Sequence, residues 1–537
     1  MSSTFTNPLI WEDLPDPEVL RVGNTYYMSA SSFHFSPGAP ILTSPNLIDW
    51  TYIGHSIPTL PPPDRFTLNP KRPTAYGKGV WASTVKYRPS NGLFYFYSAI
   101  QGTDKTYVYT ARDPGSAWTE RGAIERFYYD LGLLVDDDDT MYIAHGTKAI
   151  HVARLNGEGV VEVESQIVHE SSDYLEGARM YKINGAYYIW LTKDSDTQTV
   201  LKSTTGPFGP YDVRDVIKGM RSPLAGSGSP HQGGLVDTPD GQWYYIAFID
   251  AFPTGRVPVM APVVFDSEGW PRVVTEYADK KGQWLLEYPR DGLGDGGERP
   301  KTHQRVRRYE FTGPTLEHYW EWNHNPDDSK WRLGDDQLIL QTGTVTESLH
   351  LATNTLTLRT VGPGSIATFC IDTSRMHDGD RAGVSMFRDE SAYIGVHKDG
   401  QSTMLVYVDD VKVGPINPDV PVGWLNGRPA ALDWKCISNG EVRAQRPLAH
   451  ARVWLRVTVD MRSACFGEEE NDATRKATFS YSYDGGSFER LGPDYALTRS
   501  MAGYIGYRFG LFNFATKELG GELRLSSCDF EIWEPSD

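Results

Sequence analysis

The feature that most constrains the fold is a short unit that recurs five times between Gly23 and Tyr245. In each copy a polar turn is followed by a strand rich in aromatic side chains, and the turns begin at Gly23, Asn91, Asp136, Asn184 and Asp240. In the fourth copy, Asn184-Gly185 supplies residues that accept the positive φ of a tight hairpin. Units at roughly this spacing predict a five-bladed β-propeller. Strand spacing alone would also allow a pair of β-sandwiches.

One side chain of a kind found in functional sites lies upstream of each aromatic strand. These side chains are, in chain order, Asp16, Trp81, Asp130, Glu176 and His231. The innermost strands of a propeller line its axis, so a shared register would bring all five together. Three acids, an aromatic ring and a histidine are the composition of a site and not of a core. Taken singly, Asp16 could be a turn residue and His231 a histidine bonded to backbone.

The chain changes character after Pro289. Residues Asp291 to Lys301 are glycine-rich and polar, as in a linker. From about Tyr309 onward, short alternating strands such as Leu349 to Leu358 are separated by turn signals. We therefore predict an all-β protein with a five-bladed β-propeller catalytic domain over residues 1–300 and a C-terminal β-sandwich over residues 301–537.

Composition narrows the possible partners. With 52 basic and 69 acidic residues the net charge is −17, which argues against nucleic acid because a polyanion needs a positive field. The chain contains no run of 18 apolar residues, so no membrane span is predicted. The first residues lack the basic and apolar regions of a signal peptide. The chain is therefore expected to be cytoplasmic if complete, or secreted if a signal was removed.

The four cysteines lie in the last third of the chain. Their spacing matches no metal motif. We interpret Cys370, Cys436, Cys465 and Cys528 as free thiols, with one disulfide in the C-terminal domain as the alternative.

The three acids suit glycoside hydrolysis. Asp16 lies between two prolines, which fix the backbone. Asp130 begins an apolar strand, where a carboxylate is costly without a task or a partner. Glu176 lies among Tyr and Met side chains, where desolvation would raise its pKa and suit a proton donor. Inverting glycosidases hold two carboxyl groups about 6.5–9.5 Å apart, and acids on different blades could meet that spacing.

Other residues fit sugar or cation binding. Phe33 and Trp81 could present flat faces to a sugar ring, with core packing as the alternative. Arg256 could donate hydrogen bonds to hydroxyl groups or orient a carboxylate. His231 is a candidate ligand of an axial cation. A Ca²⁺ ion prefers oxygen ligands, so it would be held there mostly through water.

Several motifs, in this order, resemble those of glycoside hydrolase family 43. They are Leu14-Pro15-Asp16-Pro17, Arg21 to Tyr27, Ser36 to Pro40, Gly79 to Ala82, Tyr129 to Leu134, Glu176-Gly177, His231 to Gly234, and Gly255 to Pro271. The part after the linker resembles the β-sandwich that many of these enzymes carry. The resemblance implies a five-bladed propeller and hydrolysis with inversion of the anomeric centre.

Matching motifs imply a role for each candidate. Asp16 corresponds to the general base, Asp130 to the residue that tunes and orients the acid, and Glu176 to the general acid. His231 corresponds to a central histidine that binds Ca²⁺ or Na⁺, often through water, and no organic cofactor is implied. The residues that line the terminal-sugar pocket correspond to Phe33, Trp81 and Arg256. A sandwich residue can approach this pocket in relatives, and Phe509 is the candidate here.

The finer likeness is to two-domain α-L-arabinofuranosidases that trim arabinoxylan. It is carried by Trp11 to Leu14, Ser36 to Pro40 and Glu176 to Arg179. Many relatives have His where this chain has Leu14 and Pro where it has Ala178, which cautions against copying xylosidase specificity. The implied activity is release of terminal α-L-arabinofuranose, including O3-linked arabinose of doubly substituted xylose. The alternatives are a β-xylosidase, a bifunctional enzyme, and a carbohydrate-binding protein without catalysis.

Overall fold

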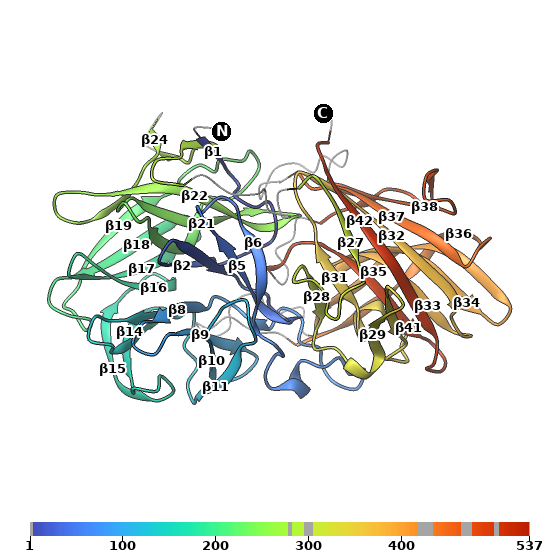
Figure 1. Ribbon diagram of the computed structural model, residues 1–537, viewed down its shortest axis with the longest axis horizontal. Coiled ribbons are helices and arrows are strands. Elements are labelled where there is room, and N and C mark those ends of the chain that lie inside the picture. Colours follow the sequence, from blue (N-terminus) through green and yellow to red (C-terminus); the bar gives the residue numbers. More distant parts are fainter. Residues whose placement is uncertain are drawn as a thin grey trace.

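The structure is a computed structural model that describes residues 4–277, 282–294, 304–416, 433–462, 475–498 and 504–535. The chain forms two lobes side by side, a propeller in blue to green and a sandwich in yellow to red (Figure 1). The described helical segments are the short 3₁₀ turns η1 (Pro63–Arg65), η3 (Asp328–Lys330) and η4 (Leu349–Leu351). No helix in the described ranges could span a membrane. The predicted all-β fold is confirmed.

Five antiparallel sheets form the blades. Blade one contains β2 (Glu18–Val22), β3 (Thr25–Ser29), β5 (Gly38–Ser44) and β6 (Thr51–Ile57). Blade two contains β7 (Gly79–Val80), β8 (Thr84–Arg88), β9 (Leu93–Gln101), β10 (Thr106–Ala111) and β11 (Thr119–Ile124). Blade three contains β12 (Gly132–Val135), β13 (Met141–Gly146), β14 (Ala149–Leu155) and β15 (Glu162–Glu170).

The last two blades close the ring. Blade four contains β16 (Leu175–Ile183), β17 (Ala186–Lys193), β18 (Thr197–Ser203) and β19 (Asp212–Lys218). Blade five contains β20 (His231–Asp237), β21 (Trp243–Ala251), β22 (Gly255–Phe265) and β23 (Pro271–Val273). The inner strands β2, β8, β12, β16 and β20 contact one another in sequence, and β20 contacts β2. Beyond the blades, β1 (Thr4–Thr6) pairs with β26 (Glu287–Pro289), while β24 (Glu276–Tyr277) pairs with β25 (Gly282–Gln283).

The predicted hairpin of blade four illustrates how local sequence sets the register. Ile183 pairs with Ala186 across Asn184 and Gly185, whose φ angles are 51° and 79°. Two positive φ angles are what a tight hairpin turn requires. The register then places Trp190 in the core against Tyr245 of blade five, with ring centroids 4.7 Å apart. Aromatic strands therefore bind adjacent blades together.

Two larger sheets form the sandwich. One runs β29 (Trp331–Gly334), β30 (Gln337–Gln341), β42 (Glu522–Trp533), β32 (Gly364–Arg375), β37 (Arg452–Asp460), β38 (Lys476–Ser482) and β39 (Glu489–Arg490). In addition, β27 (Val306–Glu310) pairs with β42, and β40 (Tyr495–Ala496) pairs with β38. The other runs β36 (Trp434–Pro447), β35 (Ser402–Pro415), β34 (Glu390–Asp399), β33 (Asp380–Phe387), β41 (Arg508–Ala515), β31 (Leu356–Arg359), β28 (Trp320–Asn323) and β4 (Phe35–Ser36). The strand predicted over Leu349 to Leu358 is wrong at its start, because η4 and the positive φ of Asn354 precede β31.

The two domains share a sheet and a buried ion cluster. Strand β4 belongs to the propeller segment, yet it pairs with β28 of the sandwich. Fully buried Glu321 accepts from Arg508 at 2.6 Å, and its other oxygen lies 3.0 Å from Arg359 and from His55 of blade one. Opposite charges beside it lower the pKa of Glu321 despite burial. Residues 295–301 of the expected linker lie outside the described ranges.

Candidate active site

The three candidate acids, which we call the acid cluster (Asp16, Asp130 and Glu176), lie where inner strands begin. Asp16 and Asp130 each precede an inner strand by two residues, and Glu176 is the second residue of β16. The backbone N–H of Gly177 donates to Oδ2 of Asp130 at 3.1 Å, which joins blades three and four. The strand pairing shifts between Glu176 and Arg179, and such a bulge re-aims a side chain.

A buried arginine lies beneath the acid cluster. Arg179 donates to the backbone carbonyls of Asp16 at 3.3 Å and Leu131 at 3.2 Å, and it forms an ion pair with Glu18. These contacts connect three blades. Its side chain is fully buried, so its positive charge acts on Asp130 with little screening.

Asp16 is held rigidly. Ser31 Oγ donates to its Oδ2 at 2.6 Å, and Arg256 Nη1 donates to its Oδ1 at 3.1 Å. The residue is 5% exposed and has a φ of 56°, which is uncommon for a residue other than glycine. Both oxygens accept hydrogen bonds, as those of a carboxylate do. A fixed carboxylate of this kind can orient and deprotonate a water molecule.

Glu176 has the properties of a proton donor. Burial raises the pKa of Glu176 to about 7, and the negative charge of Asp16 acts in the same direction. The Tyr129 hydroxyl, which donates to Oε2 at 3.1 Å, and the Arg256 charge both oppose this rise. A carboxylic acid with a pKa near neutrality can hold a proton for transfer at physiological pH.

Asp130 is a buried acid of the cluster. Burial raises its pKa well above the ordinary value, and the charges of Glu176 and Asp16 raise it further. Arg179 and the Gly177 N–H favour the charged form. Since carboxyl groups that share a desolvated site resist simultaneous ionisation, Asp130 can influence when Glu176 loses its proton.

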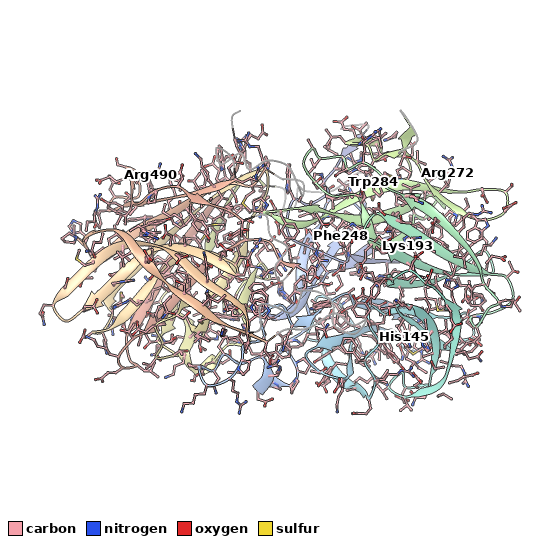
Figure 2. All side chains as sticks on the ribbon, turned by 180° about the vertical axis from the view of Figure 1, so that it is seen from behind. His145, Lys193, Phe248, Arg272, Trp284 and Arg490 are labelled. Atoms are coloured by element: carbon pink, nitrogen blue, oxygen red, sulfur yellow. The ribbon has the colours of Figure 1, made fainter. Side chains whose placement is uncertain are left out.

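Of the predicted aromatic and basic residues, Arg256 contacts Asp16, and ring contacts connect Phe33 and Trp81 to Arg256. Arg256 lies over the rings of Phe33 at 5.4 Å and Phe248 at 4.9 Å. Figure 2 shows Phe248 on the side of the propeller toward the sandwich. Trp81 meets Phe33 edge-on, with centroids 6.1 Å apart. Phe33 is almost fully buried, whereas Trp81 is partly exposed. The partly exposed ring of Trp81 can contact the apolar face of a sugar, and the guanidinium of Arg256 can donate hydrogen bonds to its hydroxyl groups.

The sandwich contributes Tyr504, which the sequence reasoning missed. Its ring lies 5.7 Å from Trp81 and 5.9 Å from the Arg256 guanidinium. Burial raises the pKa of Tyr504, and the Arg256 charge opposes this rise. We call Phe33, Trp81 and Tyr504 the aromatic wall.

The prediction of Phe509 as a substrate-binding residue is wrong. This side chain is fully buried on β41 and packs edge-on against Phe530 at 6.1 Å, inside the sandwich. Its strand alternation directs it into the core, and the residue that reaches the site lies five positions earlier in the chain. No periodic pattern marks Tyr504, because it precedes β41 and is placed by contacts with the other domain.

Asp13 fixes the segment that carries Tyr504. Its Oδ1 accepts from the backbone N–H of Arg256 at 2.8 Å, and its Oδ2 accepts from that of Gly506 at 2.9 Å. One buried carboxylate thus joins blade five to the sandwich. Burial raises the pKa of Asp13, and the two N–H donors oppose that shift.

His231 lies at the start of β20, and its side chain contacts Ser229 and Phe248. Its Nδ1 is 2.7 Å from the Ser229 carbonyl, and its ring packs edge-on against Phe248 at 4.3 Å. Within the described ranges, no three His, Cys, Asp or Glu side chains are arranged to hold a metal ion. The donor set therefore does not fit direct coordination by protein groups, and a cation held through water stays a prediction.

The family comparisons agree with this architecture. Residues 5–271 match the model of glycosyl hydrolases family 43, and residues 308–426 match a β-xylosidase C-terminal concanavalin A-like domain. A putative β-xylosidase of Xylanibacter ruminicola is 31% identical, with 68% of each chain covered. A non-reducing end α-L-arabinofuranosidase of Bacteroides ovatus is 26% identical, with 62% of this chain and 63% of the relative covered.

A solved structure extends the likeness over both domains. It is a family 43 glycoside hydrolase described as engineered to display both endo-xylanase and exo-arabinofuranosidase activity. It is 43% identical to this chain, has a TM-score of 0.90, and the match covers 99% of this chain and all of that one. The chain is a glycoside hydrolase and belongs to glycosyl hydrolase family 43.

Proposed function

We propose that this enzyme releases terminal α-L-arabinofuranose from arabinoxylan or arabinoxylo-oligosaccharides, including O3-linked arabinose of doubly substituted xylose. The observation that carries the proposal is the two-domain likeness to a solved enzyme described as having exo-arabinofuranosidase activity. In this proposal, the only binding partners of the enzyme are its carbohydrate substrates.

The acid cluster supplies the two proton transfers of an inverting hydrolysis. Asp16 takes a proton from water as the water oxygen bonds to the anomeric carbon. The bond from that carbon to the leaving xylose oxygen breaks, and that oxygen receives the Glu176 proton. Asp130 accepts a hydrogen bond from the Gly177 N–H, which fixes the backbone beside Glu176. Arg256 orients Asp16 and is placed to donate to sugar hydroxyl groups.

A β-xylosidase is the second candidate. Its support is the C-terminal match to a β-xylosidase domain and the likeness to a putative β-xylosidase. Both sugars are neutral pentoses, so the same acids and aromatic wall could serve either substrate or both.

Rates on three substrates test the choice. Aryl arabinofuranoside, aryl xylopyranoside and doubly substituted arabinoxylan are compared at one enzyme concentration, with product sugars identified by chromatography. We expect arabinose from the first and third substrates and slow turnover of the second. A preference for the xylopyranoside would instead establish the β-xylosidase candidate. The Glu176→Gln enzyme serves as the control for contaminating activity.

A further inference from the structure

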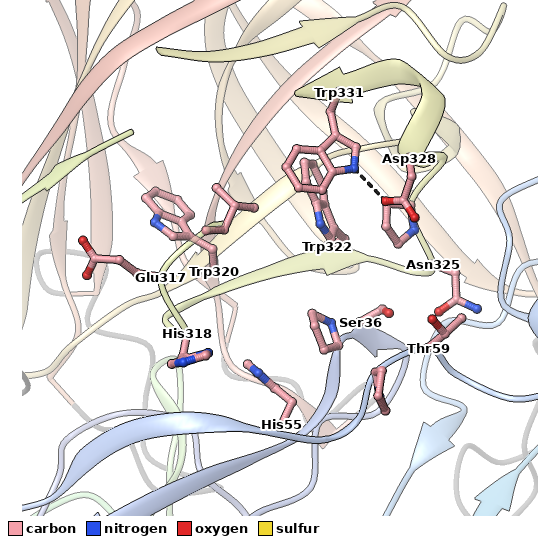
Figure 3. Close-up of a pocket in the computed structure, with 14 residues that line it drawn as sticks. Ser36, His55, Thr59, Glu317, His318, Trp320, Trp322, Asn325, Asp328 and Trp331 are labelled. Atoms are coloured by element: carbon pink, nitrogen blue, oxygen red, sulfur yellow. Dashed lines mark hydrogen bonds between the residues drawn. The ribbon is translucent and has the colours of Figure 1, made fainter. Parts of the chain in front are cut away.

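A second cavity lies where the two domains meet, and the acid cluster contributes none of its lining. Its volume is about 270 Å³, near the lower end of the roughly 300–1,000 Å³ of ligand sites. Figure 3 shows that one side comes from the propeller segment with Ser36, His55 and Thr59, and the other from the sandwich. We call it the junction cavity.

Three tryptophans from the sandwich line the junction cavity. Trp320 and Trp322 lie on β28, each about 3% exposed, whereas Trp331 begins β29 and is partly exposed. The rings of Trp322 and Trp331 are 5.0 Å apart. The accessible part of the Trp331 ring, beside the two buried rings, can pack against an apolar face of a ligand.

Trp331 is fixed before any ligand arrives. Its Nε1 donates to Oδ1 of Asp328 at 2.9 Å, a bond drawn in Figure 3. Asp328 lies in η3, whose preceding residue Asp327 accepts from the Ser329 N–H and caps the turn. A ring held in one orientation loses little conformational freedom when it binds.

The polar lining favours a neutral, hydroxyl-rich ligand. Glu317 and Asp328 bring carboxylates, His318 and Thr59 bring exposed polar groups, and no lysine or arginine is among the described lining residues. Carboxylates accept hydrogen bonds from hydroxyl groups and repel anions. A sugar ring has an apolar C–H face and a rim of hydroxyl groups, so it matches this combination of tryptophan and carboxylate.

We propose that the junction cavity is a second carbohydrate-binding site that takes a short xylosyl segment of the xylan backbone. The choice of xylan rests on the proposed function, whereas the inference of a sugar rests on the lining. Binding there would hold the enzyme on polymer without contacting the scissile bond. Binding at this site would therefore affect the hydrolysis of polymeric substrate and leave the rate of hydrolysis of small aryl substrates unchanged.

The test compares xylohexaose binding by calorimetry and retention on insoluble arabinoxylan, in a Glu176→Gln background that prevents turnover. The variants are Trp331→Ala and Asp328→Ala. The matched control is Trp454→Ala, which removes another partly exposed sandwich tryptophan on β37, outside the cavity. We expect Trp331→Ala to weaken xylohexaose binding about tenfold, equivalent to about 1.4 kcal/mol, and Asp328→Ala to weaken it less. Trp454→Ala should bind as the parent does.

Two further measurements separate this proposal from the proposed function. Thermal unfolding establishes whether each variant is folded. If Trp331→Ala does not fold, the binding comparison is made with Asp328→Ala. With Glu176 intact, Trp331→Ala should hydrolyse aryl arabinofuranoside at the unaltered rate. Xylohexaose binding equal to the parent in the folded cavity variants would overturn the second site. Failure to hydrolyse aryl arabinofuranoside in the parent enzyme would overturn the function and leave the binding comparison valid.

Discussion

Asp16, Asp130 and Glu176 occupy equivalent places in three blades of the propeller, whereas Tyr504 comes from the sandwich and is placed by Asp13. The three acids converge because each lies where the inner strand of a repeated unit begins. Tyr504 does not belong to a repeated unit, and its position depends on a contact between segments far apart in the chain. The comparison teaches that the propeller supplies the acids proposed to transfer protons, whereas the sandwich helps to shape the surface beside them.

The largest effect is expected on the propeller side, from Glu176→Gln. Loss of a general acid removes about 10²–10⁴ in rate, and we expect the upper part of that range for arabinoxylan. The loss should be smaller for aryl substrates, whose leaving groups need less protonation. Initial rates on both substrates check this, with exposed Glu120→Gln as control. Comparable activity of the Glu176 and Glu120 variants would remove the acid from the mechanism.

Arg179→Met tests how much the buried ion pair between Arg179 and Glu18 contributes to the stability of the fold. Removing one partner of a buried ion pair leaves Glu18 partly uncompensated, although Lys86 also pairs with it. We expect a loss of about 3–5 kcal/mol in the free energy of unfolding, measured by urea titration. Arg154→Met, which breaks a surface pair with Glu164, should cost under about 1 kcal/mol. Equal costs would contradict the structural role of Arg179.

Tyr504→Ala tests the sandwich side of the comparison. The change removes one ring of the aromatic wall, so we expect kcat/KM for aryl arabinofuranoside to fall about tenfold, or about 1.4 kcal/mol. Most of the loss should appear in KM, because no proton transfer depends on this residue. Tyr504→Phe should retain most of the activity. A kcat loss as large as that of Glu176→Gln would place the tyrosine in the chemistry instead.

The smallest effect is expected from Tyr129→Phe. The Tyr129 hydroxyl stabilises the charged form of Glu176, so its removal should raise the pKa of that acid. In the proposed mechanism Glu176 acts when protonated, so activity is expected to be present below its pKa and to be lost as pH rises through it. The alkaline limb of kcat/KM, expected near pH 7 in the parent, should move to higher pH. Tyr128→Phe is the control, since that hydroxyl donates to Glu162. A shift to lower pH would contradict the assignment.

The sequence predicted what local patterns determine. Asn184-Gly185 set a hairpin, and the shared position of the acids ahead of the aromatic strands indicated their convergence. Phe509 was proposed from the likeness to two-domain relatives, and it lies in the sandwich core because such a likeness does not tell which face of a strand meets the other domain. Tyr504, Asp13 and Arg179 act through long-range contacts, and no spacing in the chain marks those contacts.

The central claim is that Asp16 and Glu176 hydrolyse the glycosidic bond in one displacement by water. Proton NMR of arabinoxylan digestion, recorded before the released sugar mutarotates, tests it most directly. The account predicts that the first arabinofuranose to appear is the β anomer, inverted from the α linkage of the substrate. First appearance of the α anomer would contradict it, because retention requires a covalent intermediate in place of a general base.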